Sequence, residues 1–167
     1  MKLALTKPQL QTILQQTLVT GLVVMVGGVV LQNVLNIVWL LVGGMIGIAL
    51  WWLDELVGLA YYRRNELDTE LITRSPLFML VFGVVALFVV TSTDQHIGFG
   101  VIWGMCAGIL VEVLSLAAQP EAFVERFFGM VTRTTKLVLT QIQTTQIAAG
   151  VTAYVALLVC LWVLRLT

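Results

Sequence analysis

Long apolar segments, separated from one another by short polar stretches, dominate this sequence. The segments rich in Leu, Val, Ile, Ala and Gly and poor in charge are residues 12–31, 34–53, 77–92, 97–118 and 147–166. A helix of about 20 such residues crosses the roughly 30 Å of hydrocarbon in a bilayer. We therefore predict an all-α integral membrane protein, a single transmembrane domain of about five transmembrane helices arranged as two hairpins and a final span.

The composition of the chain favours the same class of protein. Of its 167 residues, 59% are hydrophobic and 11% are charged, whereas average soluble domains carry about 25% charged residues. A water-soluble fold of this size cannot hide so much apolar surface, so the lipid bilayer must cover it. Nine basic residues balance nine acidic ones, and this balance gives no reason to expect nucleic acid as a partner.

The segment of residues 120–145 has a different, amphipathic pattern. Val124, Val131 and Val138 recur every seventh residue, and basic residues interrupt them. Such a pattern is typical of a helix that lies in the membrane interface on the cytoplasmic side. The alternative is that the segment extends the last span outward and packs on a neighbouring helix.

The basic residues predict how the chain is oriented. With the N-terminus inside, eight of the nine Lys and Arg residues lie on the cytoplasmic side, and only Arg165 lies outside. This asymmetry follows the positive-inside rule and predicts a multi-pass protein of the plasma (inner) membrane with an outer C-terminus. The cytoplasmic residues that we expect to contact soluble partners or anionic lipids are Arg63, Arg64, Arg74, Arg126, Arg133 and Lys136.

Glycines recur every fourth residue in the fourth apolar segment and lead to an acid. This track consists of Gly100, Gly104, Gly108 and Glu112. Positions four apart lie on one face of a helix, and small residues on a spanning helix let another helix approach closely. Gly43 and Gly47 have the same spacing in the second segment. We predict that these five glycines pack helices, within the chain or between subunits; the alternative is that they line a pore.

The second and fourth segments resemble each other. A shift of 57 positions pairs Gly43 with Gly100, Gly47 with Gly104 and Glu55 with Glu112. Membrane proteins are often built from such repeats, and in that case the two helices would face each other across a pseudo-two-fold axis. The other interpretation is a chance match in apolar sequence that is rich in glycine.

Glu112 lies about six residues, or roughly 9 Å, from the inner end of its span. An acid at this depth must be protonated, paired or wetted, because exposing its charge to lipid costs at least a few kcal/mol. A functional interpretation makes Glu112, together with Glu55, an ion or proton site. A structural interpretation pairs Glu112 with Arg126 or Arg133.

Motifs for catalysis or cofactor binding are missing from the sequence. It has no Walker-type loop, no HExxH, no GxSxG and no cluster of metal ligands. Cys106 and Cys160 have no CxxC context and are interpreted as small buried hydrophobic residues. We therefore expect neither an enzyme nor a protein with a cofactor.

Two function classes agree with these observations. The first is a structural or accessory subunit of a membrane complex, which packs through glycine-rich helix faces against copies of itself or other membrane subunits. The second is a small oligomeric channel or transporter subunit, in which several copies bring Glu112 to a shared proton or cation pathway.

Overall fold

The computed structural model describes residues 7–31, 34–61, 72–132 and 137–166, and every regular element within them is a helix. In chain order these are α1 (Lys7–Leu31), α2 (Val34–Tyr61), the short 3-10 helix η1 (Ile72–Arg74), α3 (Pro76–Ser92), α4 (His96–Leu116), α5 (Pro120–Thr132) and α6 (Gln141–Leu166). The prediction of an all-α fold is confirmed for the described residues.

Among the described residues, three helices are long and apolar enough to cross a membrane. These candidate spans are Leu35–Asp54 in α2, His96–Leu116 in α4 and Gln141–Arg165 in α6. Helix α3 is apolar as well, but its 17 residues extend only about 26 Å at 1.5 Å per residue. The fold is thus that of a helical protein suited to a membrane, and the number of five spans stays a prediction.

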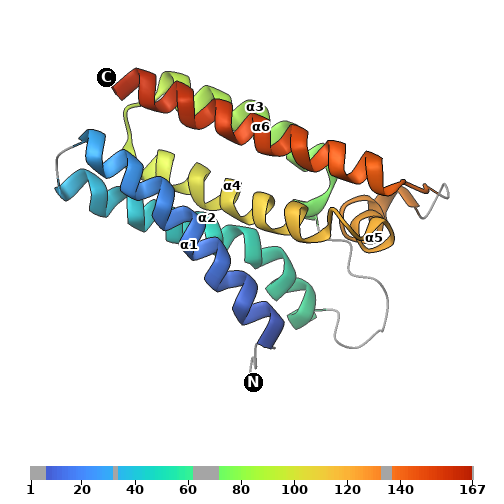
Figure 1. The fold of residues 1–167 in the computed structure, drawn as a ribbon. Helices are drawn as coiled ribbons and strands as arrows, with labels where there is room; N and C mark the ends of the chain where they lie inside the picture. Colours follow the sequence, from blue (N-terminus) through green and yellow to red (C-terminus); the bar gives the residue numbers. More distant parts are fainter. Residues whose placement is uncertain (1–6, 32–33, 62–71, 133–136, 167) are drawn as a thin grey trace.

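Helix α4 is the centre of the bundle. Figure 1 shows α4 running between two helix pairs, with α1 and α2 on one side and α3 and α6 on the other. Of the three candidate spans, α4 is 67% buried within the chain, compared with 39% for α2 and 17% for α6. The other helices therefore share α4 as their common packing partner, and α6 is the least buried of the three candidate spans.

Helix boundaries follow local chemistry at several positions. Pro76 is the first residue of α3, where its missing N–H is not needed. Ser75 precedes it as the N-cap, and its hydroxyl accepts a hydrogen bond from the backbone N–H of Phe78 at 3.2 Å. Helix α2, however, continues past Asp54 to Tyr61, so the expected end at residue 53 marks the end of the apolar run and not of the helix.

The turn between α3 and α4 is fastened to the C-terminal end of α6. The guanidinium of Arg165 donates to the backbone carbonyls of Val90 at 3.0 Å and Thr93 at 2.7 Å. It also pairs with the carboxylate of Asp94 at 2.6 Å. A single basic side chain thus satisfies carbonyls that the end of α3 leaves without helical partners.

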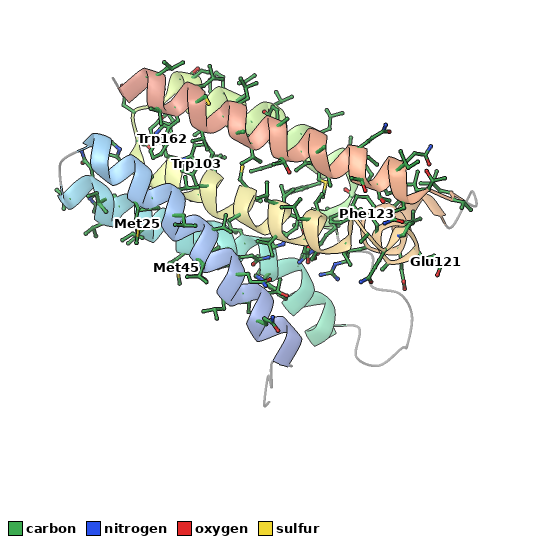
Figure 2. All side chains as sticks on the ribbon, viewed as in Figure 1. Met25, Met45, Trp103, Glu121, Phe123 and Trp162 are labelled. Atoms are coloured by element: carbon green, nitrogen blue, oxygen red, sulfur yellow. The ribbon has the colours of Figure 1, made fainter. Side chains whose placement is uncertain are left out.

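The segment of residues 120–145 is divided between two helices. Residues 120–132 form α5, and α6 begins at Gln141, six residues before the predicted start of the last span. In Figure 1, α5 is seen nearly end-on while the long helices run across the view, so α5 lies crosswise at one end of the bundle. Its buried face carries Phe123 and Phe127, and Glu121 points away from the bundle (Figure 2). The described part of α5 is therefore a separate amphipathic helix and not an extension of α6.

Aromatic side chains fill the space between α4 and α6. Trp162 of α6 packs against Phe99 and Trp103 of α4, with ring centroids 5.8 and 5.4 Å apart. Figure 2 shows Trp103 and Trp162 at the end of the bundle opposite α5. All three rings are buried, and they hold α6 against the central helix α4.

Candidate functional site at the C-terminal end of helix α4

The predicted glycine faces of α2 and α4 meet each other. A Cβ atom built on Gly43 would lie 3.0 Å from the Cα of Gly100, and one built on Gly47 would lie 3.0 Å from the Cα of Gly104. Real Cβ contacts are longer than this, so each of these positions requires glycine. The structure therefore assigns these four glycines to packing within the chain.

The contacts between the two helices are reciprocal. A Cβ on Gly43 would overlap the carbonyl oxygen of Ile97, and one on Gly100 would overlap that of Leu40. The shift of 57 positions converts the first contact into the second, since it relates Gly43 to Gly100 and Leu40 to Ile97. The contact of Gly47 with Val101 likewise corresponds to that of Gly104 with Gly44. Carbonyl oxygens facing glycine Cα–H groups recur where helices approach closely.

The local two-fold arrangement does not extend to the other helices. Helix α1 packs along both α2 and α4, whereas α3 lies beside α6 (Figure 1). The repeat interpretation thus agrees with the packing of α2 on α4 and not with that of the two hairpins. The side chain of Glu55, the counterpart of Glu112, lies outside the described residues.

Gly108 makes a different contact from the other glycines of the track. Its Cβ position would be 2.7 Å from the indole ring of Trp51, a side chain and not a backbone. Trp51 corresponds to Gly108 in the shift of 57 residues. At this pair of positions α2 supplies a large indole ring, and α4 supplies a glycine that leaves room for it. The ring lies fully buried and forms one wall of the site described next.

Glu112 is held by two arginines from outside its own helix. Arg74 of η1 donates through Nε to Oε2 at 3.1 Å and through Nη2 to Oε1 at 3.2 Å. Arg126 of α5 donates through Nη2 to Oε1 at 2.7 Å. The pairing of Arg74 is bidentate, the strongest geometry for an arginine and a carboxylate. The pair with Arg126 is one of the two alternatives, Arg126 or Arg133, that the structural interpretation of the sequence gives.

Arg74 is enclosed on every side by protein. Its side chain is 0% exposed, while that of Glu112 is 7% exposed and that of Arg126 is 29% exposed. Its Nη1 donates to the carbonyl of Trp51 at 3.0 Å, and its guanidinium lies 4.6 Å from the ring centroid of Trp51. Arginine suits this environment, because its flat cation can bind a carboxylate in its plane and stack on an aromatic ring.

Two further polar contacts surround this cluster. The carboxylate of Asp54 accepts hydrogen bonds from the backbone N–H of Thr73 at 2.8 Å and from its hydroxyl at 3.1 Å. The indole N–H of Trp52 donates to the side-chain oxygen of Gln16 at 2.6 Å. The first contact fastens η1 to α2, and the second joins α1 to α2. Directed polar hydrogen bonds thus join α1, α2 and η1 at this end of the bundle.

The contacts of this cluster favour a structural role over a transport or metal site. Both oxygens of Glu112 accept charged hydrogen bonds, so two arginine cations already pair with this carboxylate within the chain. Within the part of the chain that the structure describes, no three His, Cys, Asp or Glu side chains lie close enough to hold a metal ion. The arrangement can neutralise a buried acid and fix η1 and α5 to α4.

Three sequence interpretations change with this geometry. Arg74 was assigned to a surface for partners or lipid, but that assignment is wrong because the side chain is fully buried against Glu112 and Trp51. Cys160 was interpreted as buried and is exposed on α6, whereas Cys106 is buried as expected. Arg126 keeps some exposure but is turned toward Glu112. The remaining basic residues of that surface, Arg63, Arg64, Arg133 and Lys136, lie outside the described residues.

Sequence reasoning missed Arg74 as the main partner of Glu112, and it did not single out Gln16. Arg74 and Glu112 are 38 positions apart, and no periodic pattern connects a loop residue to a helix face at that separation. One signal was available. Arg74 immediately precedes the N-cap of α3, and Glu112 lies near the C-terminal end of α4, which is at the same end of the α3–α4 hairpin. An arginine and an acid at the same depth in a membrane protein are candidates for pairing.

The chain was also compared with known proteins. The comparisons with protein-family models, with curated proteins and with solved structures find no match.

Proposed function

We propose that this protein is a structural or accessory subunit of a membrane complex, and that helix α6 is the surface through which it meets a transmembrane helix of another subunit or of a second copy. The observation that carries the proposal is the low coverage of α6, which is 17% buried within its own chain. The glycine faces of α2 and α4 pack against each other within the chain. Contact with another subunit therefore requires a different surface.

The exposed side of α6 has the residues that such a contact needs. Small exposed residues follow one another at intervals of four, three and four positions, which places them on one face of the helix. They are Ala149, Ala153, Ala156 and Cys160. In lipid, small residues favour helix association because they let two backbones approach closely. We refer to these four residues as the small-residue face of α6.

Enlarging the small-residue face tests the proposal. We expect wild-type protein in lipid nanodiscs to show the mass of a complex by native mass spectrometry, and Ala156→Leu to lose the additional subunits because the larger side chain separates the helices. The matched control is Ala49→Leu, which makes the same change at an exposed alanine of α2. The proposal is wrong if the wild type is a monomer without other chains, or if both variants change the mass alike.

Cys160 allows the partner at this face to be identified. It is a free and exposed thiol, and Cys106 is buried. Oxidation in native membranes should join two Cys160 side chains if the partner is a second copy, while a short thiol-directed crosslinker should trap a different subunit. In the Ala156→Leu variant both products should decrease.

The second function class, a proton or cation pathway through Glu112, is weakened by the two arginines that occupy its carboxylate. For an accessory subunit we expect reconstituted wild-type vesicles to pass protons no faster than vesicles without protein. A wild-type flux that Glu112→Gln abolishes, with the helix content measured by circular dichroism unchanged, would instead establish the transport function.

The proposal includes the orientation predicted from the basic residues, with the N-terminus in the cytoplasm of a plasma (inner) membrane and the C-terminus outside. Figure 1 shows the two termini at opposite ends of the bundle, with α5 at the end where the N-terminal helix begins. With that orientation Arg126 and α5 face the cytoplasm, as the positive-inside rule requires. Reporter fusions at each end of the chain test this orientation.

A further inference from the structure

A cavity of about 190 Å³ lies between α3, α4 and α6. Its walls include Phe82 and Gly83 of α3, Cys106 and Ile109 of α4, and Gly150 and Tyr154 of α6. The two glycines create the space. A Cβ on Gly150 would touch nothing within 4 Å, and one on Gly83 would touch only the ring of Tyr154, at 3.7 Å.

The position of the cavity determines what can enter it. Gly83 is the eighth of the 17 residues of α3, Cys106 the eleventh of the 21 of α4, and Tyr154 the fourteenth of the 26 of α6. All three are at the middle of their helices, so a bilayer that these helices cross places the cavity near its middle. Gly150 is exposed, so the cavity reaches the surface there, where the surrounding medium is lipid hydrocarbon.

The lining of the cavity is suited to a hydrocarbon and to nothing more polar. Its one strong polar group is the hydroxyl of Tyr154, and this hydroxyl donates its hydrogen bond to the carbonyl of Gly83. An apolar cavity of about 150 Å³ holds a molecule of the size of benzene and excludes water. This slightly larger cavity has room for several methylene groups.

From this size, depth and lining we propose that the cavity between α3, α4 and α6 binds the end of an acyl chain from a membrane lipid. The bound chain fills the space between α3, α4 and α6, and it adds the dispersion contacts that the two glycines leave unmade. This site is distinct from the small-residue face of α6 and does not depend on the proposed accessory function.

Photolabelling tests the site directly. The protein is placed in phosphatidylcholine nanodiscs with a trace of a phospholipid that carries a diazirine near the end of one acyl chain. After irradiation we expect adducts on Cys106 and Ile109, which line the cavity and are only 3% and 6% exposed. A diazirine placed near the glycerol group should not label them, because it lies at the wrong depth.

Two substitutions should close the cavity. Gly150→Leu fills it from the surface, and Cys106→Leu fills it from the central helix; each should lower the yield of adducts on Ile109 several-fold. The matched control is Gly21→Leu in α1, another glycine whose Cβ would meet nothing within 4 Å, and it should leave the yield unchanged. Since Gly150→Leu improves helix propensity, it is expected to fold.

The outcome that overturns the proposal is also specific. A lipid that only covers the surface labels outward side chains such as Leu80 and Val84, which are 67% and 64% exposed. If wild-type adducts are confined to such residues and none occurs on Cys106 or Ile109, no acyl chain enters the cavity. Equal labelling of Ile109 in the wild type and in both closing variants leads to the same conclusion.

Discussion

Replacing Gly104 with alanine is expected to lower the free energy of unfolding by at least about 3 kcal/mol, near or beyond the upper end of ordinary overpacking costs. The added methyl group would overlap the carbonyl oxygen of Gly44 and lie 2.9 Å from the backbone nitrogen of Ile48. Backbone atoms cannot rotate away, so α2 and α4 must separate along their contact. Thermal unfolding in detergent, followed by circular dichroism, should show a melting temperature lower by roughly 6–12 °C.

Two other glycines complete this test as a graded series. Gly108→Ala should cost less than Gly104→Ala, since its new methyl group meets the side chain of Trp51, which can shift. Gly21→Ala should be neutral or stabilising by up to about 1 kcal/mol, because nothing lies near its Cβ position and alanine is the better helix former. If all three variants have the same melting temperature, the close approach of α2 and α4 does not stabilise the fold.

Replacing Glu112 with glutamine is expected to cost about 3–5 kcal/mol, the range for removing one member of a buried ion pair. The loss leaves the fully buried guanidinium of Arg74 without its carboxylate. The shape of the side chain is kept, so a change in melting temperature reports the charge and not the packing. A Glu112→Gln protein that melts with the wild type would show that the carboxylate does not hold the bundle together.

Two companion variants separate the roles of the two arginines. Arg126→Gln should cost less than about 1 kcal/mol, because its side chain is 29% exposed and the pair is partly screened by water. Arg74→Met combined with Glu112→Leu should recover part of the loss seen for Glu112→Gln, since a buried pair can often be replaced by apolar side chains. A double-mutant cycle on Arg74 and Glu112 then measures their coupling.

Much of the fold could be predicted from local patterns. The apolar segments predicted helices near the right places, and the third segment, predicted from residue 77, begins within one residue of the start of α3 at Pro76. The predicted helix ends were less accurate where the apolar run stops before the helix does. At Asp54 the apolar run has ended, but α2 continues to Tyr61. A helix tolerates a polar residue on its exposed side, so the end of an apolar run is a weak sign of the end of a helix.

The candidate site was predicted only in part. Glu112 stood out because an acid in an apolar segment must find a partner, and Arg126 was one of the two partners named. The role of Arg74 could not be deduced, since it depends on how the chain returns from α2 to α3 and brings η1 against Trp51. Such a contact is set by tertiary packing and not by residue spacing.

The sequence by itself determined the class of this protein and the requirement for close helix packing. An apolar composition demands lipid or burial, and glycine at every fourth position puts a flat strip on one side of a helix, whatever surrounds it. Only the tertiary structure decided that Gly43 and Gly47 are the partners of Gly100 and Gly104, and that Arg74 neutralises Glu112. The physical reason is that helix periodicity comes from neighbouring residues, whereas the choice of partner comes from the free energy of packing distant segments around one central helix.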